Sequence, residues 1–158
     1  NERMKVCQFM ALLEQMRIEE WEYDHDTAYG RVDCVGIYRY TMYWYYSASS
    51  VKALKISTHV EGTYRNSVYN KTDPKKNVVG KGKIDANTEF RIGMGLFRNP
   101  FGDDGHFAVY VGNYFPGYEN AVIESVYGGV IIRELSESEA INDPFTHYGH
   151  MKGIDYTN

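Results

Sequence analysis

Cysteine is scarce in this chain of 158 residues, which contains only Cys7 and Cys34. Two cysteines cannot form the disulfide framework that stabilises many small secreted domains. The sequence also lacks a Cys-x-x-Cys motif and any Cys/His spacing typical of zinc sites. The chain therefore gives no reason to expect a disulfide scaffold or a zinc site, and each cysteine must be explained by packing or by chemistry.

Long apolar runs and an excess of basic residues are also missing. No stretch of about 18 apolar residues occurs, so we expect no membrane span. Residues 1–20 contain charges throughout and lack the apolar centre of a signal peptide. The net charge is -4, whereas nucleic-acid binding needs a basic face, so we expect no nucleic-acid partner. Because the chain begins with Asn, we expect a processed form or a piece of a larger protein, and localisation stays open.

The first half of the chain has the apolar spacing of helices, within what is most simply a single domain over residues 1–158. Residues 3–20 predict an amphipathic helix in which Cys7 is a small packed thiol. The run from 34 to 46 is apolar or aromatic on nearly every face, which predicts a buried helix. The apolar positions that share one face of the first helix are Val6, Phe9, Met10, Leu13 and Met16.

Shorter features follow these two helices. Residues 22–33 are polar and contain glycine, which predicts a loop. A third helix is expected at 48–57, with Ser47, Ser49 or Ser50 as its cap. Residues 62–88 are rich in Gly, Asn, Lys and Asp and predict an irregular connection, with a short helix at 63–70 as an option.

The second half has the short periodic runs of strands. Four candidates are separated by Gly-, Pro- and Asp-rich turn signals. They are residues 89–97, 106–113, 120–127 and 129–135. The Gly-Gly pair at 128–129 predicts a tight hairpin between the last two. Helices followed by antiparallel strands indicate the α+β class, with N-terminal helices packed on an antiparallel sheet.

Cys34, His106 and Glu124 are the residues that fit nucleophilic chemistry. Cys34 stands at the predicted start of the buried helix, preceded by Asp33 at a capping position, and we expect the helix N-terminus to lower the pKa of the thiol. Free backbone amides at that point suit an oxyanion. His106 opens a strand after a turn, where it can act as general base. Glu124 lies between Val122 and Val126 on one strand face and, if buried, needs a partner such as a histidine on the adjacent strand.

Three segments, taken in order, resemble the NlpC/P60 family of cysteine peptidases. Residues 29–36, YGRVDCVG, resemble its Tyr-x-x-x-Asp-Cys-Ser-Gly signature. Residues 105–113, GHFAVYVGN, resemble its Gly-His-Val-x-(Ile/Val)-Tyr-x-Gly strand, and residues 121–125, AVIES, line up with the strand that carries the third polar residue. The matches span residues 29–127, which is most of the chain.

This resemblance implies a papain-like α+β fold and hydrolysis of amide bonds in peptidoglycan stem peptides. By position, Cys34 is the nucleophile, His106 the general base and then acid, and Glu124 the residue that orients the histidine. Tyr29 and Asp33 match positions beside the substrate. The resemblance implies no metal or organic cofactor. It favours an extracellular, cell-wall or phage-associated location, with bacterial peptidoglycan peptides as partner and a larger wall-lytic or phage protein as context.

Two positions depart from the family pattern and leave alternatives open. Val35 replaces the serine after the cysteine, which removes a hydroxyl from the substrate cleft. Glu124 stands where histidine is commonest, which is more similar to the related CHAP amidases. One alternative is a catalytically inactive module that keeps the cleft and binds wall peptides or a protein. Another keeps the Cys-His chemistry for a different amide. The remaining histidines, which show no partner pattern in the sequence, are His25, His59, His147 and His150.

Overall fold

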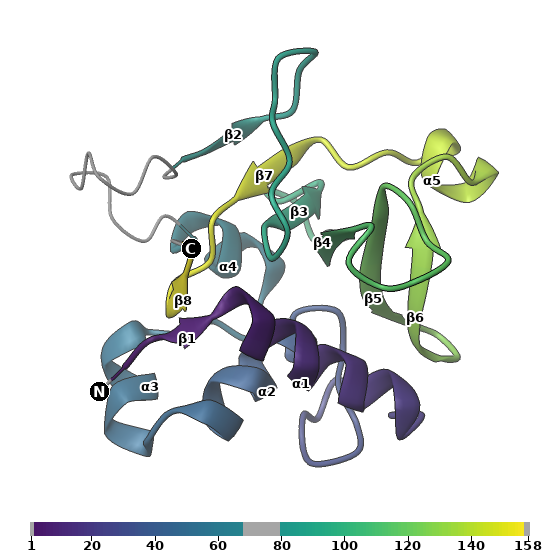
Figure 1. The fold of residues 1–158 in the computed structure, drawn as a ribbon. Helices are drawn as coiled ribbons and strands as arrows, with labels where there is room; N and C mark the ends of the chain where they lie inside the picture. The colour runs from purple at the N-terminus through teal and green to yellow at the C-terminus, as the bar shows by residue number, and fades with distance from the viewer. Residues whose placement is uncertain (1, 68–79, 157–158) are drawn as a thin grey trace.

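The structure is a computed structural model that describes residues 2–67 and 80–156. Its central element is an antiparallel sheet of six strands in the order β2-β7-β3-β4-β5-β6 (Figure 1). The strands are β2 (Lys81–Lys83), β3 (Gly95–Arg98), β4 (His106–Gly112), β5 (Ala121–Val126), β6 (Gly129–Glu134) and β7 (His147–Gly149). The predicted strands at 106–113, 120–127 and 129–135 are confirmed as β4, β5 and β6, whereas the strand predicted at 89–97 is confirmed only at its end, as β3, because residues 89–94 form no strand. The strands β2 and β7 were not predicted, because three-residue segments carry too little alternation to be recognised.

Five helices within the described residues accompany the sheet, and the chain is therefore α+β, as predicted. They are α1 (Val6–Ile18), α2 (Gly36–Tyr45), α3 (Ala48–Leu54), α4 (Val60–Arg65) and α5 (Ser138–Asn142). The Ser47 hydroxyl caps α3 by accepting the Ser50 amide at 3.3 Å. The short helix expected at 63–70 begins earlier, as α4, and the end of that range lies outside the described residues. No sequence pattern had indicated α5.

The first helix packs on the core through Phe9, Met10, Leu13 and Met16, as its spacing predicted. Cys7 is exposed, so its prediction as a packed thiol is wrong. It lies about half a turn away from the buried face, where the helical period directs a side chain to solvent. Just before α1, the strand β1 (Met4–Lys5) pairs in parallel with β8 (Ile154–Asp155), which brings the two ends of the chain together (Figure 1).

The two faces of the sheet bury different cores. Phe107, Val109 and Ile123 belong to the larger core, which contains α1, α2 and Cys34. Ala108 and Val122 belong to a smaller core on the opposite face. Because side chains alternate along a strand, His106 lies on the face of Ala108 and Glu124 on the face of Val122. The strands thus carry the imidazole and the carboxylate on one face while the helix of Cys34 packs on the other.

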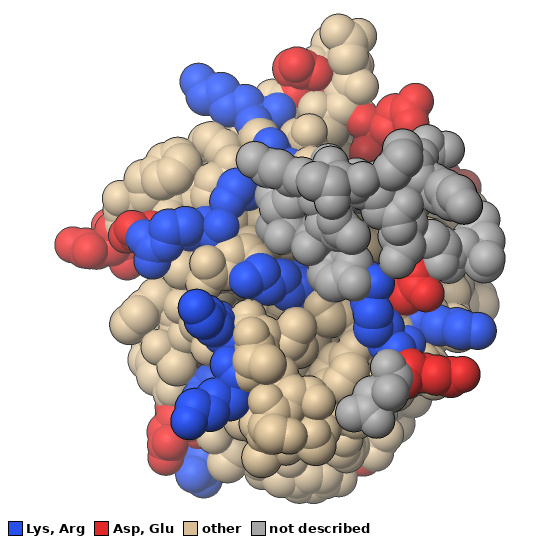
Figure 2. All heavy atoms as spheres, turned by 90° about the vertical axis from the view of Figure 1, so that its left-hand side faces the viewer, with Lys and Arg blue, Asp and Glu red and all other residues tan. Residues whose placement is uncertain are grey.

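Charge is distributed unevenly over the surface. On the face shown in Figure 2, Lys and Arg side chains lie across the middle, and Asp and Glu side chains lie mostly towards its edges. The net charge of -4 is therefore not a uniform negative potential over the molecule.

Candidate active site

Cys34 lies in the turn that leads into α2, and its residue is only 7% exposed. Asp33 Oδ1 accepts a hydrogen bond of 2.7 Å from the amide of Gly36, the first residue of α2, so Asp33 supports the helix end, although the N-cap is Val35 and not Asp33 as predicted. A Cβ atom at Gly36 would lie 2.9 Å from the same oxygen. Glycine at this position therefore lets the carboxylate approach the helix end, which fixes the turn that carries the thiol.

Three backbone amides face the sulfur of Cys34, those of Phe107, Val35 and Cys34 itself. Burial nevertheless raises the pKa of the thiol to about 11, with the negative charge of Asp33 as a further cause. The expected lowering of this pKa by the helix end is therefore wrong. Removal from water disfavours the thiolate more strongly than the three amides stabilise it. The thiol is protonated at neutral pH.

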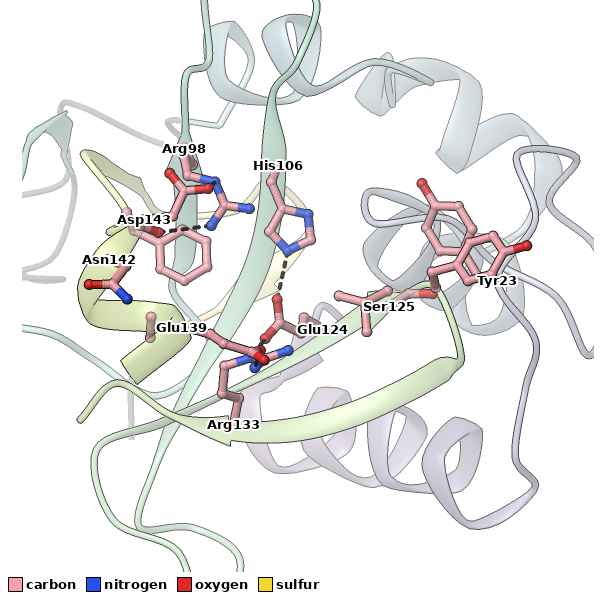
Figure 3. Close-up of a pocket in the computed structure, with 13 residues that line it drawn as sticks. Tyr23, Arg98, His106, Glu124, Ser125, Arg133, Glu139, Asn142 and Asp143 are labelled. Carbon is pink, nitrogen blue, oxygen red and sulfur yellow. Dashed lines mark hydrogen bonds and ion pairs between the residues drawn. The ribbon is translucent and has the colours of Figure 1, made fainter. Parts of the chain in front are cut away.

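His106 and Glu124 form a close pair on neighbouring strands. The Nε2 atom of His106 lies 2.7 Å from Oε1 of Glu124 (Figure 3). Their side chains are 13% and 5% exposed, respectively. The sequence had required a partner for a buried carboxylate at this position, and the structure confirms that the partner is this histidine.

Glu124 also pairs with Arg133, and the ionised state of its carboxylate identifies which nitrogen of His106 donates the hydrogen bond. Arg133 Nε lies 2.8 Å from Oε2 of Glu124. Burial acts to raise the pKa of Glu124, but the hydrogen bonds and charges of His106 and Arg133 outweigh it, so this pKa is lowered. An ionised carboxylate only accepts hydrogen bonds, so Nε2 of His106 is the donor. Within the described residues, Nδ1 of the ring makes no hydrogen bond and is left as an acceptor when the ring is neutral.

A cavity of about 600 Å³ opens beside this pair. The Phe145 ring stacks on the His106 ring at a centroid distance of 6.0 Å and forms one wall. Tyr23 forms part of the opposite side (Figure 3). The other lining residues are Arg98, Glu124, Ser125, Val126, Tyr127, Arg133, Glu139, Ala140, Asn142 and Asp143.

A second cavity, of about 330 Å³, contains Cys34. Its lining includes the acidic residues Asp33, Glu61 and Asp103, and no Lys or Arg. His25 also lines it and approaches Asp33 Oδ2 with its Nδ1 at 3.4 Å, a partner that the sequence pattern had not indicated. The remaining lining residues are Tyr23, Val35, Thr58, His59, Val60, Gly102 and Gly105.

The two cavities meet at Tyr23, which lines both. Burial raises the pKa of its hydroxyl, and the charges of Cys34 and Asp33 add to this rise. Sequence reasoning missed Tyr23, because nothing distinguishes it within a polar loop. Arg133 was also missed, although the hairpin at 128–129 pairs Val122 with Arg133 and so places Arg133 on the face of Glu124.

The structure brings Cys34 against the beginning of β4 but leaves it unbonded to the imidazole. Gly105 lines the cavity of Cys34, and the amide of Phe107 faces the sulfur, so the thiol lies next to the backbone on both sides of His106. No hydrogen bond joins the Cys34 sulfur to the His106 ring in the part of the chain that the structure describes. The thiol and the imidazole–carboxylate pair are thus neighbours at the N-terminal end of β4, an inner strand of the sheet.

Tyr29 and Val35, the other predicted substrate residues, have different places. Val35 is buried and lines the smaller cavity. Tyr29 lines neither cavity and is 61% exposed. Its hydroxyl donates to Glu19 Oε1 at 2.6 Å, and its ring packs on Trp21 at 4.9 Å. The polar loop turns between Tyr29 and Asp33, so closeness in sequence does not bring the tyrosine to the thiol.

Neither a metal-binding cluster nor a membrane-spanning helix occurs within residues 2–67 and 80–156. No group of three or more His, Cys, Asp or Glu side chains is placed to hold a metal ion there. His150 instead approaches the Gly80 carbonyl with Nδ1 at 3.0 Å. None of the described helices has the length and apolar character needed to cross a membrane.

Comparison of the chain with models of protein families finds no match, and a search of curated proteins finds no relative. The likeness to the NlpC/P60 motifs therefore rests on the three quoted sequence segments.

Proposed function

We propose that the protein is a cysteine peptidase or amidase of the NlpC/P60 type, with a papain-like fold, that hydrolyses amide bonds in peptidoglycan stem peptides. The observation that carries the proposal is the pair of His106 Nε2 and Glu124 Oε1 at 2.7 Å, in which His106 stands on the strand whose Phe107 amide faces the Cys34 thiol. A nucleophile, a base and a residue that orients the base are the parts that covalent amide hydrolysis needs.

The protonated thiol determines how the first step runs. Because the pKa of Cys34 is about 11, a preformed thiolate is rare at neutral pH, and His106 Nδ1 must take the proton as sulfur attacks the carbonyl carbon. Glu124 stabilises the imidazolium that results. Bound substrate also has to bring the thiol and imidazole into contact, since catalytic hydrogen bonds are often loose before substrate binds.

The remaining steps return the enzyme to its starting state. The imidazolium of His106 gives its proton to the amide nitrogen, the C–N bond breaks and the amine leaves, with the acyl group held on Cys34 as a thioester. Water then attacks this thioester while His106 accepts its proton. The C–S bond breaks, the acid leaves and the thiol is reprotonated. The amides beside Cys34 are the donors positioned for the oxyanion of each tetrahedral intermediate.

The test is digestion of purified peptidoglycan, with products identified by mass spectrometry. Cys34→Ala should reduce product formation by about a thousandfold or more, because Cys34 is the only thiol among the residues that line the cavity. Cys7→Ala is the matched control, since that thiol is exposed and should be dispensable. Full activity in Cys34→Ala would overturn the proposal. The products released from walls that differ in stem-peptide composition identify which amide bond is cut. They also show whether the substrate is a wall peptide or another amide.

A second candidate is a binding module that keeps the cavity but does not cleave. It is favoured by one observation, the burial that raises the pKa of Cys34 to about 11. In this case the native protein and Cys34→Ala should sediment with insoluble peptidoglycan to the same extent, and neither should release products. Product release by the native protein alone excludes this candidate.

A further inference from the structure

Glu124 is bound on both of its oxygens, and only one of these contacts belongs to the proposed triad. Oε1 meets His106 at 2.7 Å and Oε2 meets Arg133 Nε at 2.8 Å. The Arg133 side chain is 18% exposed and that of Glu124 is 5% exposed, so solvent screens their contact little. The buried carboxylate is therefore shared between an imidazole and a guanidinium.

Arg133 reaches this position through the β5–β6 hairpin. Gly128 and Gly129 have φ values of 111° and 120°, which residues with side chains rarely adopt, and this turn sets the pairing of Val122 with Arg133. Arg133 then lies on the same sheet face as Glu124. Its Nη1 atom contacts Glu139 of α5, so the guanidinium bridges the sheet and the wall of the larger cavity (Figure 3).

We propose that Arg133 is a positioning residue that orients the Glu124 carboxylate and, by sharing its negative charge, keeps the His106 imidazole neutral and ready to accept the Cys34 proton. The inference rests on the proposed function. A buried carboxylate that faced only an imidazole would favour the imidazolium, which cannot act as a base. A guanidinium on the other oxygen reduces that preference, because it neutralises the carboxylate and repels a second positive charge.

The other charged groups around the ring do not replace Arg133. Arg98 lies opposite His106 on β3, but its Nε is paired with Asp143 Oδ2 at 3.1 Å. Glu139 offsets part of the charge of Arg133, yet its side chain is 75% exposed, so solvent screens it more strongly. The Tyr23 hydroxyl, whose pKa is raised by burial, is neutral near neutral pH and adds no charge.

The test follows the His106 ring directly by NMR of protein labelled at histidine. In Arg133→Gln, the midpoint of the His106 titration should rise by about one pH unit relative to the native chain. The acidic limb of kcat/KM should move with it, so that activity at about pH 6 falls about tenfold relative to about pH 8. Arg133→Lys keeps the charge and should restore most of the native midpoint.

Two controls separate charge from folding. Arg17→Gln removes another Arg–Glu pair, which joins Arg17 to Glu14 at 2.7 Å on α1, and should leave the His106 midpoint unchanged. Arg133→Met retains the apolar stem of the side chain and serves if Arg133→Gln does not fold. An unshifted midpoint in a folded neutral variant overturns the proposal, as does an equal shift in Arg133→Lys. If both neutral variants fail to fold, Arg133 serves the fold and the proposal is likewise overturned.

The titration needs no substrate, so its outcome is independent of the peptidoglycan assay. Full activity in Cys34→Ala would overturn the proposed function, but it would not change the measured midpoint of the His106 titration. If Cys34→Ala is inactive but the His106 midpoint is unshifted in the neutral Arg133 variants, only the role of Arg133 is overturned.

Discussion

The two sides of the candidate site each bury an ionisable group, but they hold these groups in opposite charge states. On the strand side, Glu124 is almost fully buried yet ionised, because His106 and Arg133 supply a partner for each oxygen. On the helix side, Cys34 is buried beside the negative charge of Asp33, and the helix end does not compensate for this. The carboxylate is thus held in its charged form and the thiol in its neutral form.

This difference shows that burial alone does not set the charge of a group. A buried carboxylate stays charged when hydrogen-bond donors, one of them a cation, replace its water. A thiol with only backbone amides around it, and a carboxylate next to it, keeps its proton. We infer that proton transfer between the two sides, rather than a standing ion pair, is the step on which the proposed reaction depends.

The largest effect on activity should come from removing the imidazole on the strand side of the site. His106→Ala removes the only proposed acceptor for the thiol proton and should reduce kcat/KM on peptidoglycan by about a thousandfold, with KM changed far less. His147→Ala is a suitable control, because that ring lines neither cavity. Activity that survived in His106→Ala would show that another group, such as His25 in the smaller cavity, takes the proton.

A smaller effect is expected on the helix side of the site, where the pH dependence of alkylation measures the pKa of the Cys34 thiol. In a Cys7→Ser background, the alkylation rate of native Cys34 should keep rising by about tenfold per pH unit and level off only near pH 11, the pKa that burial and Asp33 give it. The same chain unfolded in urea should level off near pH 8.5, the ordinary value for a thiol.

Asp33→Asn in that background should lower the midpoint, because it removes the nearby negative charge, at some cost to the α2 cap. Mass spectrometry of iodoacetamide adducts over time gives each rate. A native thiol that alkylates rapidly at neutral pH would contradict the protonated resting state.

The smallest effect is expected at Val35, which lines the cavity of the thiol. Val35→Ser should lower the free energy of unfolding by about 1 kcal/mol, because it buries a hydroxyl in place of a packed side chain. Hydrolysis should change by less than about tenfold, with the change differing among stem peptides. Thermal unfolding and digestion of walls of different composition measure the two effects. A change of a hundredfold or more would show that the residue after the cysteine governs catalysis rather than preference.

Much of the fold could be predicted because its signals are local. The spacing of Phe9, Met10 and Leu13 indicated the buried face of α1, and strand alternation placed Glu124 on the face of Val122. The short elements β2, β7 and α5 could not be predicted. Each has five residues or fewer and is held by neighbours distant in sequence, as β7 is held between β2 and β3.

The sequence by itself determined the α+β class, the order of Cys34, His106 and Glu124 along the chain, and the need of a buried carboxylate for a partner. Only the tertiary structure decided that Arg133 and Tyr23 join the site, that Tyr29 does not line its cavities, and that the thiol is protonated. The physical reason is that periodicity and capping depend on neighbours within one helical turn or one strand. Burial and charge balance depend on which distant segments exclude water from a group, and the packing of the whole chain sets this.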